Sequence, residues 1–386
     1  MIKDYNHAME WIWQQPEWPD FQYDALALKG CDAEFIATSG RLMGRIEGMT
    51  EQSQIDISID LMLSEAIKTS SIEGEALDRD SVRASLLARI SGETSPVPAD
   101  LKSEGIATLM LDARKERNNL LTHDMLHRWQ TMAVPEERGN ITLRGHYRTG
   151  TMTIASGIAG DHYVHYEAPP AAQVLENMSR FLEWYNQSRT TLSNSGMSGL
   201  VRAGIAHLWF EQIHPFDDGN GRVGRSIADH AMSQLLGYPS IACLSTVIDS
   251  NKKLYYRELG GNNRRSLSIN SWLNYFVGAA SEAVDAAKKE VDFVLNKTRF
   301  YDSFADQLNA RQSKMVARVF AEGRKGFEGG ITTRKYEKIA KCPNRTASRD
   351  LSDMFEKGAI SKLSGSGRST RYALALIEKS PTPIIK

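Results

Sequence analysis

The residues best suited to chemistry lie in one run of twelve, residues 214–225, which reads HPFDDGNGRVGR. An imidazole such as His214, with an ordinary pKa of about 6.5, can take a proton from an attacking hydroxyl at neutral pH. A carboxylate such as Asp218 suits Mg²⁺, which is usually bound through one or two carboxylates plus the phosphates of a substrate. Gly219 and Gly221 allow backbone N–H groups to face an anion. This set predicts a site that holds a polyphosphate and its metal beside a base.

Two arginines extend this prediction. If a helix begins at the glycines, Arg222 and Arg225 lie three residues apart on one side of it, and guanidinium groups bind phosphate through two hydrogen bonds. The N-terminal end of that helix adds a partial positive charge. Apolar periodicity predicts one helix over residues 197–212, which delivers the run, and another over 222–236, which follows it.

Three other patterns fit the same letters less well. GNGRVG at 219–224 is formally a dinucleotide fingerprint, but that motif follows a strand, and residues 200–213 indicate a helix. Residues 217–221 resemble the start of a calcium loop, but the twelfth position is Ala228 where a bidentate Glu is needed. An Asn-Gly turn with solvated charges explains the glycines, but not why a base, a carboxylate and two arginines crowd around them.

The run resembles the signature of the Fic family, H-x-F-x-[D/E]-G-N-G-R-x-x-R, and every specified position is filled. This resemblance implies transfer of AMP from ATP to a hydroxyl of a target protein, on a helical core. It implies that His214 is the base, Phe216 a buried anchor of the loop and Asp218 the Mg²⁺ ligand. For the binding of the ATP phosphates it implies Gly219, Asn220, Gly221, Arg222 and Arg225.

A second motif, TSSIEG at residues 69–74, resembles the inhibitory motif of the same family, [S/T]-x-x-x-E-[G/N]. The resemblance implies that Glu73 pairs with Arg225 and keeps it from the γ-phosphate of ATP. Such a desolvated pair is strong and planar. Taken alone, the hexapeptide would indicate only the end of a helix, with Gly74 as its C-cap. Because the motif precedes the signature, the chain resembles the class with an N-terminal inhibitory helix.

Two further features of the core are expected from position. Residues 151–166 carry a β-hairpin signal around a glycine-rich centre. They resemble the family's flap, which implies docking of an extended segment of the target protein by strand addition; the alternative is an ordinary surface hairpin. Tyr255 and Tyr256 resemble a position that borders the adenine and ribose, although aromatic pairs more often belong to a core.

Composition places the 386 residues among ordinary soluble proteins of two to three domains, with 41% apolar residues and no net charge. Because the net charge is zero, the overall charge gives no indication of binding to nucleic acid or to an anionic membrane. No stretch reaches the roughly 20 apolar residues of a membrane span. The N-terminus lacks the apolar segment of a signal peptide. Cys31, Cys243 and Cys342 are odd in number and far apart, so we expect reduced thiols and a cytoplasmic protein.

The expected fold is mainly α: a Fic helical core with a short hairpin flap, plus a C-terminal winged-helix (α+β) domain. Residues 1–100 are predicted as a helical region with an aromatic cap and a long helix leading to Glu73, and residues 101–298 as the catalytic core. A loop is predicted at 188–196.

Residues 299–386 are predicted as a winged-helix-like domain, and from Arg311 to Lys386 basic side chains outnumber acidic ones. Helices at about 305–322, 335–340 and 346–357, followed by a hairpin, resemble a winged helix. Over 305–375 it could bind DNA, with Arg345 and Arg349 on the recognition helix and Arg368 in the wing, or serve protein contacts or a homodimer.

Two other functions fit the sequence. A related enzyme could remove AMP, with Glu73 orienting water, or transfer another group. Alternatively, the chain could be a transcriptional regulator whose winged helix binds DNA and whose Fic core senses nucleotide.

Overall fold

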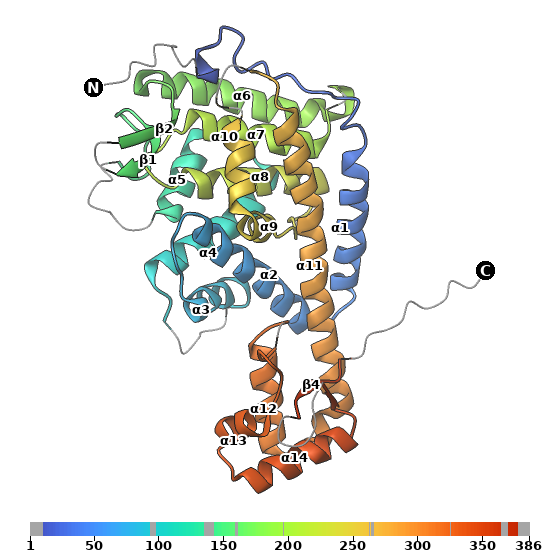
Figure 1. The fold of residues 1–386 in the computed structure, drawn as a ribbon. Coiled ribbons are helices and arrows are strands. Elements are labelled where there is room, and N and C mark those ends of the chain that lie inside the picture. The colour runs from blue at the N-terminus through green and yellow to red at the C-terminus, as the bar shows by residue number, and fades with distance from the viewer. Residues whose placement is uncertain are drawn as a thin grey trace, which may run out of the picture. The chain divides into compact units, whose positions relative to one another are not determined.

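The protein is mainly helical (Figure 1). A computed structural model describes residues 11–92, 98–134, 143–158, 161–195, 197–261, 263, 266–324, 326–363 and 370–376. Within them the strands form two antiparallel sheets of two strands each. The predicted fold class, mainly α with a short hairpin, is confirmed. The chain divides into two compact units, residues 1–288 and 289–386.

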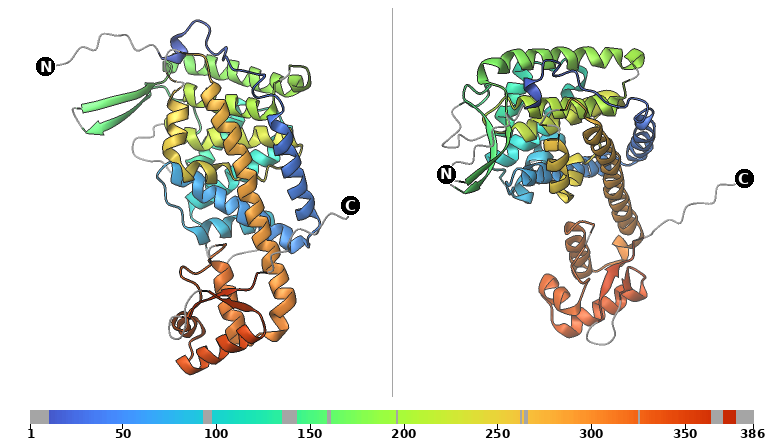
Figure 2. Two further views of the ribbon diagram at one scale, coloured as in Figure 1. Left: turned by 45° about the vertical axis from the view of Figure 1, so that its right-hand side comes forward. Right: turned by 45° about the horizontal axis from the view of Figure 1, so that its top comes forward.

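Among the described residues, the first unit contains fourteen regular elements and most of one long helix that ends beyond it (Figures 1 and 2). In chain order they are the 3₁₀ helix η1 (Ile12–Gln14), α1 (Cys31–Glu47), α2 (Glu51–Ile72), α3 (Arg79–Ile90), α4 (Leu101–Lys115), η2 (Glu116–Asn118), α5 (His123–Ala133), β1 (Thr153–Ile158), β2 (Asp161–Glu167), α6 (Ala171–Ser195), α7 (Gly199–Ile213), α8 (Asn220–Leu236), α9 (Leu244–Ser250), α10 (Lys252–Gly261) and α11 (Asn270–Phe304).

Helix α7 forms the centre of this unit. Every residue from Gly199 to Ile213 is buried, so the helix has no solvent face and must be covered on all sides. Its start is capped by Asp32, whose carboxylate accepts hydrogen bonds from the backbone N–H groups of Gly199 (2.6 Å) and Leu200 (2.9 Å). A helix held in this way provides a fixed support for the signature that follows it.

The segment predicted as one long helix leading to Glu73 forms two helices instead. α1 ends at Glu47, and α2 begins after Thr50, whose hydroxyl accepts the N–H of Ser53 (3.3 Å). This side-chain cap satisfies a free N–H at a new helix start, a signal that apolar periodicity does not register. α2 then ends at Ile72, and Gly74 adopts a φ of 75°, the left-handed conformation common after a helix end.

The aromatic N-terminal segment packs against the base of the β1–β2 hairpin. Trp11 meets Tyr166 edge to face, with 5.5 Å between the ring centroids, and the Trp13 indole N–H donates to the carbonyl of Glu167 (2.7 Å). The Tyr166 hydroxyl donates to the carbonyl of Gln212 (2.6 Å), near the end of α7. The hairpin, which projects from the helices in Figure 2, is therefore anchored at its base beside the signature.

The prediction of a loop at residues 188–196 is wrong, because α6 continues through Ser195. Ser188 explains part of the difference: its hydroxyl donates to the carbonyl of Tyr185 (3.1 Å) and accepts a hydrogen bond from Arg202 of α7 (2.8 Å). Contact with α7 here outweighs the weak helix propensity of small polar residues.

The second unit begins within α11 and has its own core. It contains η3 (Ala305–Gln307), α12 (Ala310–Ala321), α13 (Thr333–Ala340), α14 (Asn344–Glu356), β3 (Ile360–Lys362) and β4 (Tyr372–Leu374). Met315, Tyr336 and Leu351 are buried at its centre. Three helices followed by a hairpin is the order expected of a winged helix; the wing tip with Arg368 lies outside the described residues.

No helix of the described residues is both long and apolar enough to cross a membrane. Cys31, Cys243 and Cys342 are free thiols. The cytoplasmic location remains a prediction.

Candidate active site

His214, the predicted base, lies directly after α7 with φ 49° and ψ 60°, a left-handed conformation that is unusual for a residue with a side chain. Its Nδ1 lies 3.3 Å from the carbonyl oxygen of Glu211. A carbonyl can only accept, so Nδ1 carries the proton and Nε2 keeps a free lone pair. Burial lowers the pKa of His214 to about 4. The imidazole is therefore neutral at pH 7 and able to accept a proton.

The Glu211 side chain lies close to this imidazole, with its Oε2 3.8 Å from Nδ1 of His214. Burial raises the pKa of Glu211 to about 8, so the carboxyl group is mostly neutral at pH 7. His214 therefore lacks the carboxylate partner that would favour its charged form.

Arg148 holds the backbone around His214, a role that the sequence analysis missed. Its guanidinium donates to the carbonyls of His214 (2.8 Å), Gly150 (2.9 Å) and Pro169 (2.6 Å), and it is only 2% exposed. Gly150 and Pro169 flank the hairpin, so one side chain joins the catalytic loop to the base of the predicted flap. Nothing local in the sequence distinguishes this arginine from a surface one.

Phe216 and Asn220 close the loop between α7 and α8. The Phe216 ring is fully buried, as expected of an anchor. The Asn220 amide accepts the N–H of Phe216 (3.0 Å) and donates to its carbonyl (2.7 Å). Asn220 was predicted to line the phosphate site, but its side chain is used in building the loop. Only its backbone N–H remains to face an anion.

The glycines shape the start of α8. Gly219 has φ 87° and precedes the helix without any side-chain cap, so the first N–H groups of α8 are left for an anion. A Cβ atom on Gly221 would collide with the carboxylate of Glu73. The Glu73 carboxylate thus occupies the space above Gly221, which is the position expected for a phosphate.

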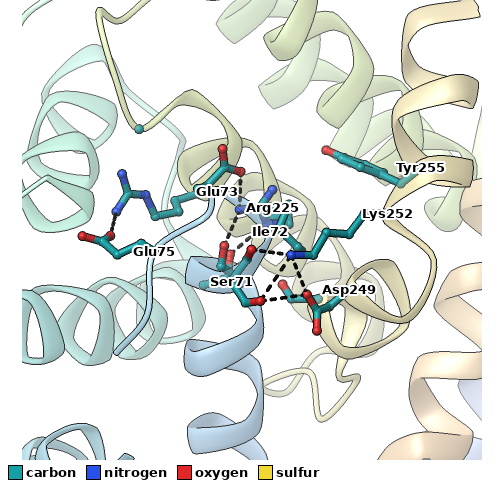
Figure 3. Close-up of polar contacts among 12 residues, drawn as sticks. Ser71, Ile72, Glu73, Glu75, Arg225, Asp249, Lys252 and Tyr255 are labelled. Atoms are coloured by element: carbon teal, nitrogen blue, oxygen red, sulfur yellow. Dashed lines mark hydrogen bonds and ion pairs between the residues drawn. The ribbon is translucent and has the colours of Figure 1, made fainter. Parts of the chain in front are cut away.

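The predicted pairing of Glu73 with Arg225 is present in the structure (Figure 3): Nη2 of Arg225 donates to Glu73 Oε1 at 2.8 Å. Arg225 also donates to the hydroxyl (2.8 Å) and carbonyl (2.9 Å) of Thr69, and it is 4% exposed. Burial opposes the charged form of Glu73, but Arg225 outweighs it and lowers the pKa of that carboxyl. The pair is therefore ionised at neutral pH.

Arg222 has an unexpected partner, because its Nη1 donates to Glu75 Oε2 at 2.7 Å. Glu75 in turn lies 3.2 Å from the ammonium group of Lys102. Both signature arginines are thus held by carboxylates of the segment that follows α2.

Comparisons with known proteins agree with this geometry. A family model described as Fic/DOC family matches residues 120–232. Residues 120–232 are a Fic/DOC domain. A second model, for a domain of unknown function (DUF4172), matches residues 11–91, the part of the chain that includes Glu73.

Two curated relatives are protein adenylyltransferases named fic-1. The protein from Caenorhabditis briggsae is 28% identical over 170 residues, 42% of this chain and 30% of that one. The protein from Caenorhabditis elegans is 27% identical over 158 residues, 40% of this chain and 28% of that one. The chain thus spans less than a third of the length of these relatives. A solved Fic family protein from Desulfovibrio desulfuricans G20 shares 21% identity, with 91% of this chain and 98% of that chain covered and a TM-score of 0.48.

Asp218 of the Fic/DOC domain fits a Mg²⁺ ligand. Its Oδ1 accepts the N–H of Gly219 (2.6 Å) and lies 3.6 Å from Arg222, and its side chain is 35% exposed. The described residues contain no cluster of three or more His, Cys, Asp or Glu able to hold a metal. A single open carboxylate suits an ion that relies on phosphate oxygens and water for its other ligands.

The two tyrosines predicted to border the adenine differ in position. Tyr255 is 1% exposed and hydrogen bonds to His207 (2.9 Å), so its ring belongs to the core and cannot face a ligand. Tyr256 is 48% exposed, and its hydroxyl donates to the carbonyl of Ile72 (3.1 Å). Of the two, only Tyr256 has a ring that a nucleotide could reach.

The end of α2 is clamped to α9 and α10 just before Glu73 (Figure 3). Lys252 donates to the carbonyl of Ser71, and Asp249 accepts from Ser71 (3.0 Å) and Lys68 (2.7 Å). The Tyr256 hydroxyl thereby pairs with the carbonyl of Ile72 at the end of the helix, and Lys252 adds to the hydrogen bond that the Ser71 carbonyl already accepts from the N–H of Gly74 (3.1 Å). The position of Glu73 is therefore fixed from both sides, by Arg225 and by this clamp.

Proposed function

We propose that the chain transfers AMP from ATP to a Ser, Thr or Tyr hydroxyl of a target protein, and that Glu73 inhibits this transfer. The observation that carries the proposal is the start of α8, which has no side-chain cap and where the Glu73 carboxylate lies against Gly221 and accepts a hydrogen bond from Arg225. A neutral histidine with a free Nε2 lies at the same junction of α7 and α8. The names of the two fic-1 relatives support the same reaction.

In the proposed reaction, His214 Nε2 accepts the proton of the target hydroxyl while that oxygen forms a bond to the α-phosphorus. The bond from this phosphorus to the oxygen bridging to the β-phosphate breaks, and pyrophosphate leaves with the bonding electrons. Backbone N–H groups of Asn220 and Gly221 would stabilise the α-phosphoryl oxygens, and Arg222 and Arg225 the outer phosphates. When bound at Asp218, Mg²⁺ supplies positive charge that neutralises phosphate oxygens.

The target would dock on the β1–β2 hairpin. Each strand of this two-stranded sheet has one edge without a partner strand among the described residues, and an extended peptide can add to such an edge. Arg148 supports this role, because it connects the residues flanking the hairpin to the carbonyl of His214.

The test is transfer of label to protein from ATP and Mg²⁺, with wild type, Glu73→Gly and Glu73→Gly/His214→Ala compared. Label from the α-phosphate should appear on protein with Glu73→Gly, be weak with wild type and vanish in the double variant. ATP labelled on the γ-phosphate is the matched control and should leave no label. Label from the γ-phosphate would instead indicate phosphoryl transfer. Loss of AMP from a pre-modified target only when Glu73 is present would favour AMP removal.

A second candidate function concerns the second unit, which could bind DNA through α14. Asp350 is 3% exposed and accepts from Arg311 (2.8 Å), whereas Arg345 and Arg349 are exposed. Between Asn344 and Asp350 the exposed charged side chains are therefore both basic, which favours an anionic partner. Duplex DNA binding that weakens steeply between roughly 50 and 200 mM salt and is lost in Arg345→Ala/Arg349→Ala would support it; no binding at low salt would dismiss it.

A further inference from the structure

Glu75 lies outside both sequence motifs, yet it is the most enclosed acid at the signature arginines. Its two carboxylate oxygens face two different cations: Oε2 accepts from Arg222 Nη1 (2.7 Å), and Oε1 lies 3.2 Å from Lys102 Nζ. The side chains of Arg222 and Glu75 are 3% and 9% exposed. The side chain of Lys102, at the start of α4, is 37% exposed, so its ammonium group can move to contact an anion that enters from solvent.

We propose that Arg222 and Lys102 form a binding subsite for one phosphate of the nucleotide, and that the Glu75 carboxylate occupies this subsite in the inhibited chain. The inference rests on the proposed function and adds Lys102 to the nucleotide-binding residues. Carboxylate and phosphate are the two anions that arginine binds with the same planar geometry. The Glu75 carboxylate therefore marks where a phosphate oxygen would lie.

Glu75 pairs with the first signature arginine as Glu73 pairs with the second. Glu73 lies against Gly221 and pairs with Arg225, while Glu75 pairs with Arg222. The two arginines lie three residues apart, on one side of α8. A polyphosphate, which carries several anionic groups in a row, could replace both carboxylates.

Exchange of Glu75 for phosphate is physically reasonable. Loss of an anion from a buried arginine is costly. Asp218 lies 3.6 Å from Arg222, and a phosphate would replace Glu75 as the closer anion. Glu75 lies in the segment between α2, which ends at Ile72, and α3, which begins at Arg79, so it can leave without unfolding a helix. Because the carboxylate competes for the same donors, it lowers the apparent affinity for nucleotide.

The test measures Mg·ATP binding by calorimetry, with every variant in a His214→Ala background so that no transfer occurs. Glu75→Gln should tighten binding about tenfold, the value of roughly one charged hydrogen bond. Lys102→Met should have little effect while Glu75 is present and should weaken binding about tenfold in the Glu75→Gln background. Inorganic tripolyphosphate should follow the same pattern, because the subsite binds phosphate and not the nucleoside.

Matched controls lie at the far end of α2, the helix that precedes Glu75, and at the far end of α4, the helix that carries Lys102. Glu51→Gln in α2 and Lys115→Met in α4 change charge at exposed positions and should leave binding unchanged. Unchanged or weaker ATP binding by Glu75→Gln with an unchanged melting temperature would overturn the subsite. If Glu75→Gln does not fold, Glu75→Ala decides: equal ATP binding with and without Lys102→Met in that variant would overturn it.

The two proposals fail differently. If Glu73→Gly transfers AMP but Glu75→Gln leaves ATP binding unaltered, only the subsite is wrong. If no variant binds Mg·ATP, including Glu73→Gly, the proposed function fails, and the subsite fails with it.

Discussion

The carboxylate of Glu73 lies so close to Gly221 that a Cβ atom on Gly221 would collide with it. Gly221 is helical, in the first turn of α8, so a side chain at this position meets no conformational strain and acts only by filling space. The inhibitory carboxylate and a phosphate of the nucleotide would thus occupy the same space above Gly221, which is open because glycine has no side chain.

The first prediction follows from this contact. Gly221→Ala in the Glu73→Gly background should fold normally but weaken Mg·ATP binding by more than about tenfold, because the methyl group fills the phosphate position. Gly278→Ala in α11 is the matched control, since a Cβ atom there meets nothing within 4 Å. ATP binding by Gly221→Ala equal to that of the control would show that phosphate does not lie above Gly221.

The second prediction concerns the pH dependence of transfer. Because burial lowers the pKa of His214 to about 4, the base stays neutral down to mildly acidic pH. With Glu73→Gly, the pH profile of kcat/KM should therefore show no fall near pH 6.5, the ordinary value for histidine. Its acid limb should lie near pH 4 to 5. A limb centred at 6.5 would mean that His214 is solvated in the active enzyme or is not the base.

The third prediction concerns Arg148. Arg148→Met in the Glu73→Gly background leaves the carbonyls of His214, Gly150 and Pro169 without their donor. We expect kcat to fall about hundredfold through misplacement of His214, with unchanged ATP affinity and about 3 kcal/mol less stability. Arg144→Met, an exposed position of the same segment, is the control. A loss of stability with an unchanged kcat would show that Arg148 stabilises the fold but does not position His214 for catalysis.

The signature identified the site because its functional residues are contiguous in the sequence. The base, the carboxylate, the glycines and the arginines all lie in the loop after α7 and in the first turns of α8. Arg148, Glu75 and Lys102 escaped prediction because their partners are distant in sequence and their own surroundings do not mark them as buried. Contacts of this kind depend on tertiary packing, which local pattern does not encode.

The roles predicted for Tyr255 and Asn220 are limited by local geometry. Tyr255 and Tyr256 are neighbours in α10, and adjacent residues of a helix do not face the same side, so both could not line one pocket. That Asn220 lines the phosphate site stays a prediction, which rests on its backbone N–H. Its side-chain amide pairs with the backbone of Phe216, as a buried amide next to a tight turn often does.

The last prediction tests the neutral state of Glu211 through stability. Burial raises its pKa to about 8 from 4.5, so between these values the folded chain binds a proton that the unfolded chain has lost. Below pH 4.5 the contribution of this proton to the free energy of unfolding is fully present. It falls by about 1.4 kcal/mol per pH unit above pH 4.5 and is lost as the pH rises through 8. Buried histidines act in the opposite direction below pH 6.5, because their pKa values are lowered.

The measurement is urea unfolding of wild type and Glu211→Gln at pH 5.5 and 7.5. The histidines and the buried Glu65 contribute equally to both proteins, so the difference between the two pH dependences isolates Glu211. Wild type should lose about 2 to 3 kcal/mol more than Glu211→Gln over this interval. Equal pH dependence would mean that Glu211 is ionised in the folded chain, and that His214 then has a carboxylate 3.8 Å from Nδ1 to stabilise its protonated form.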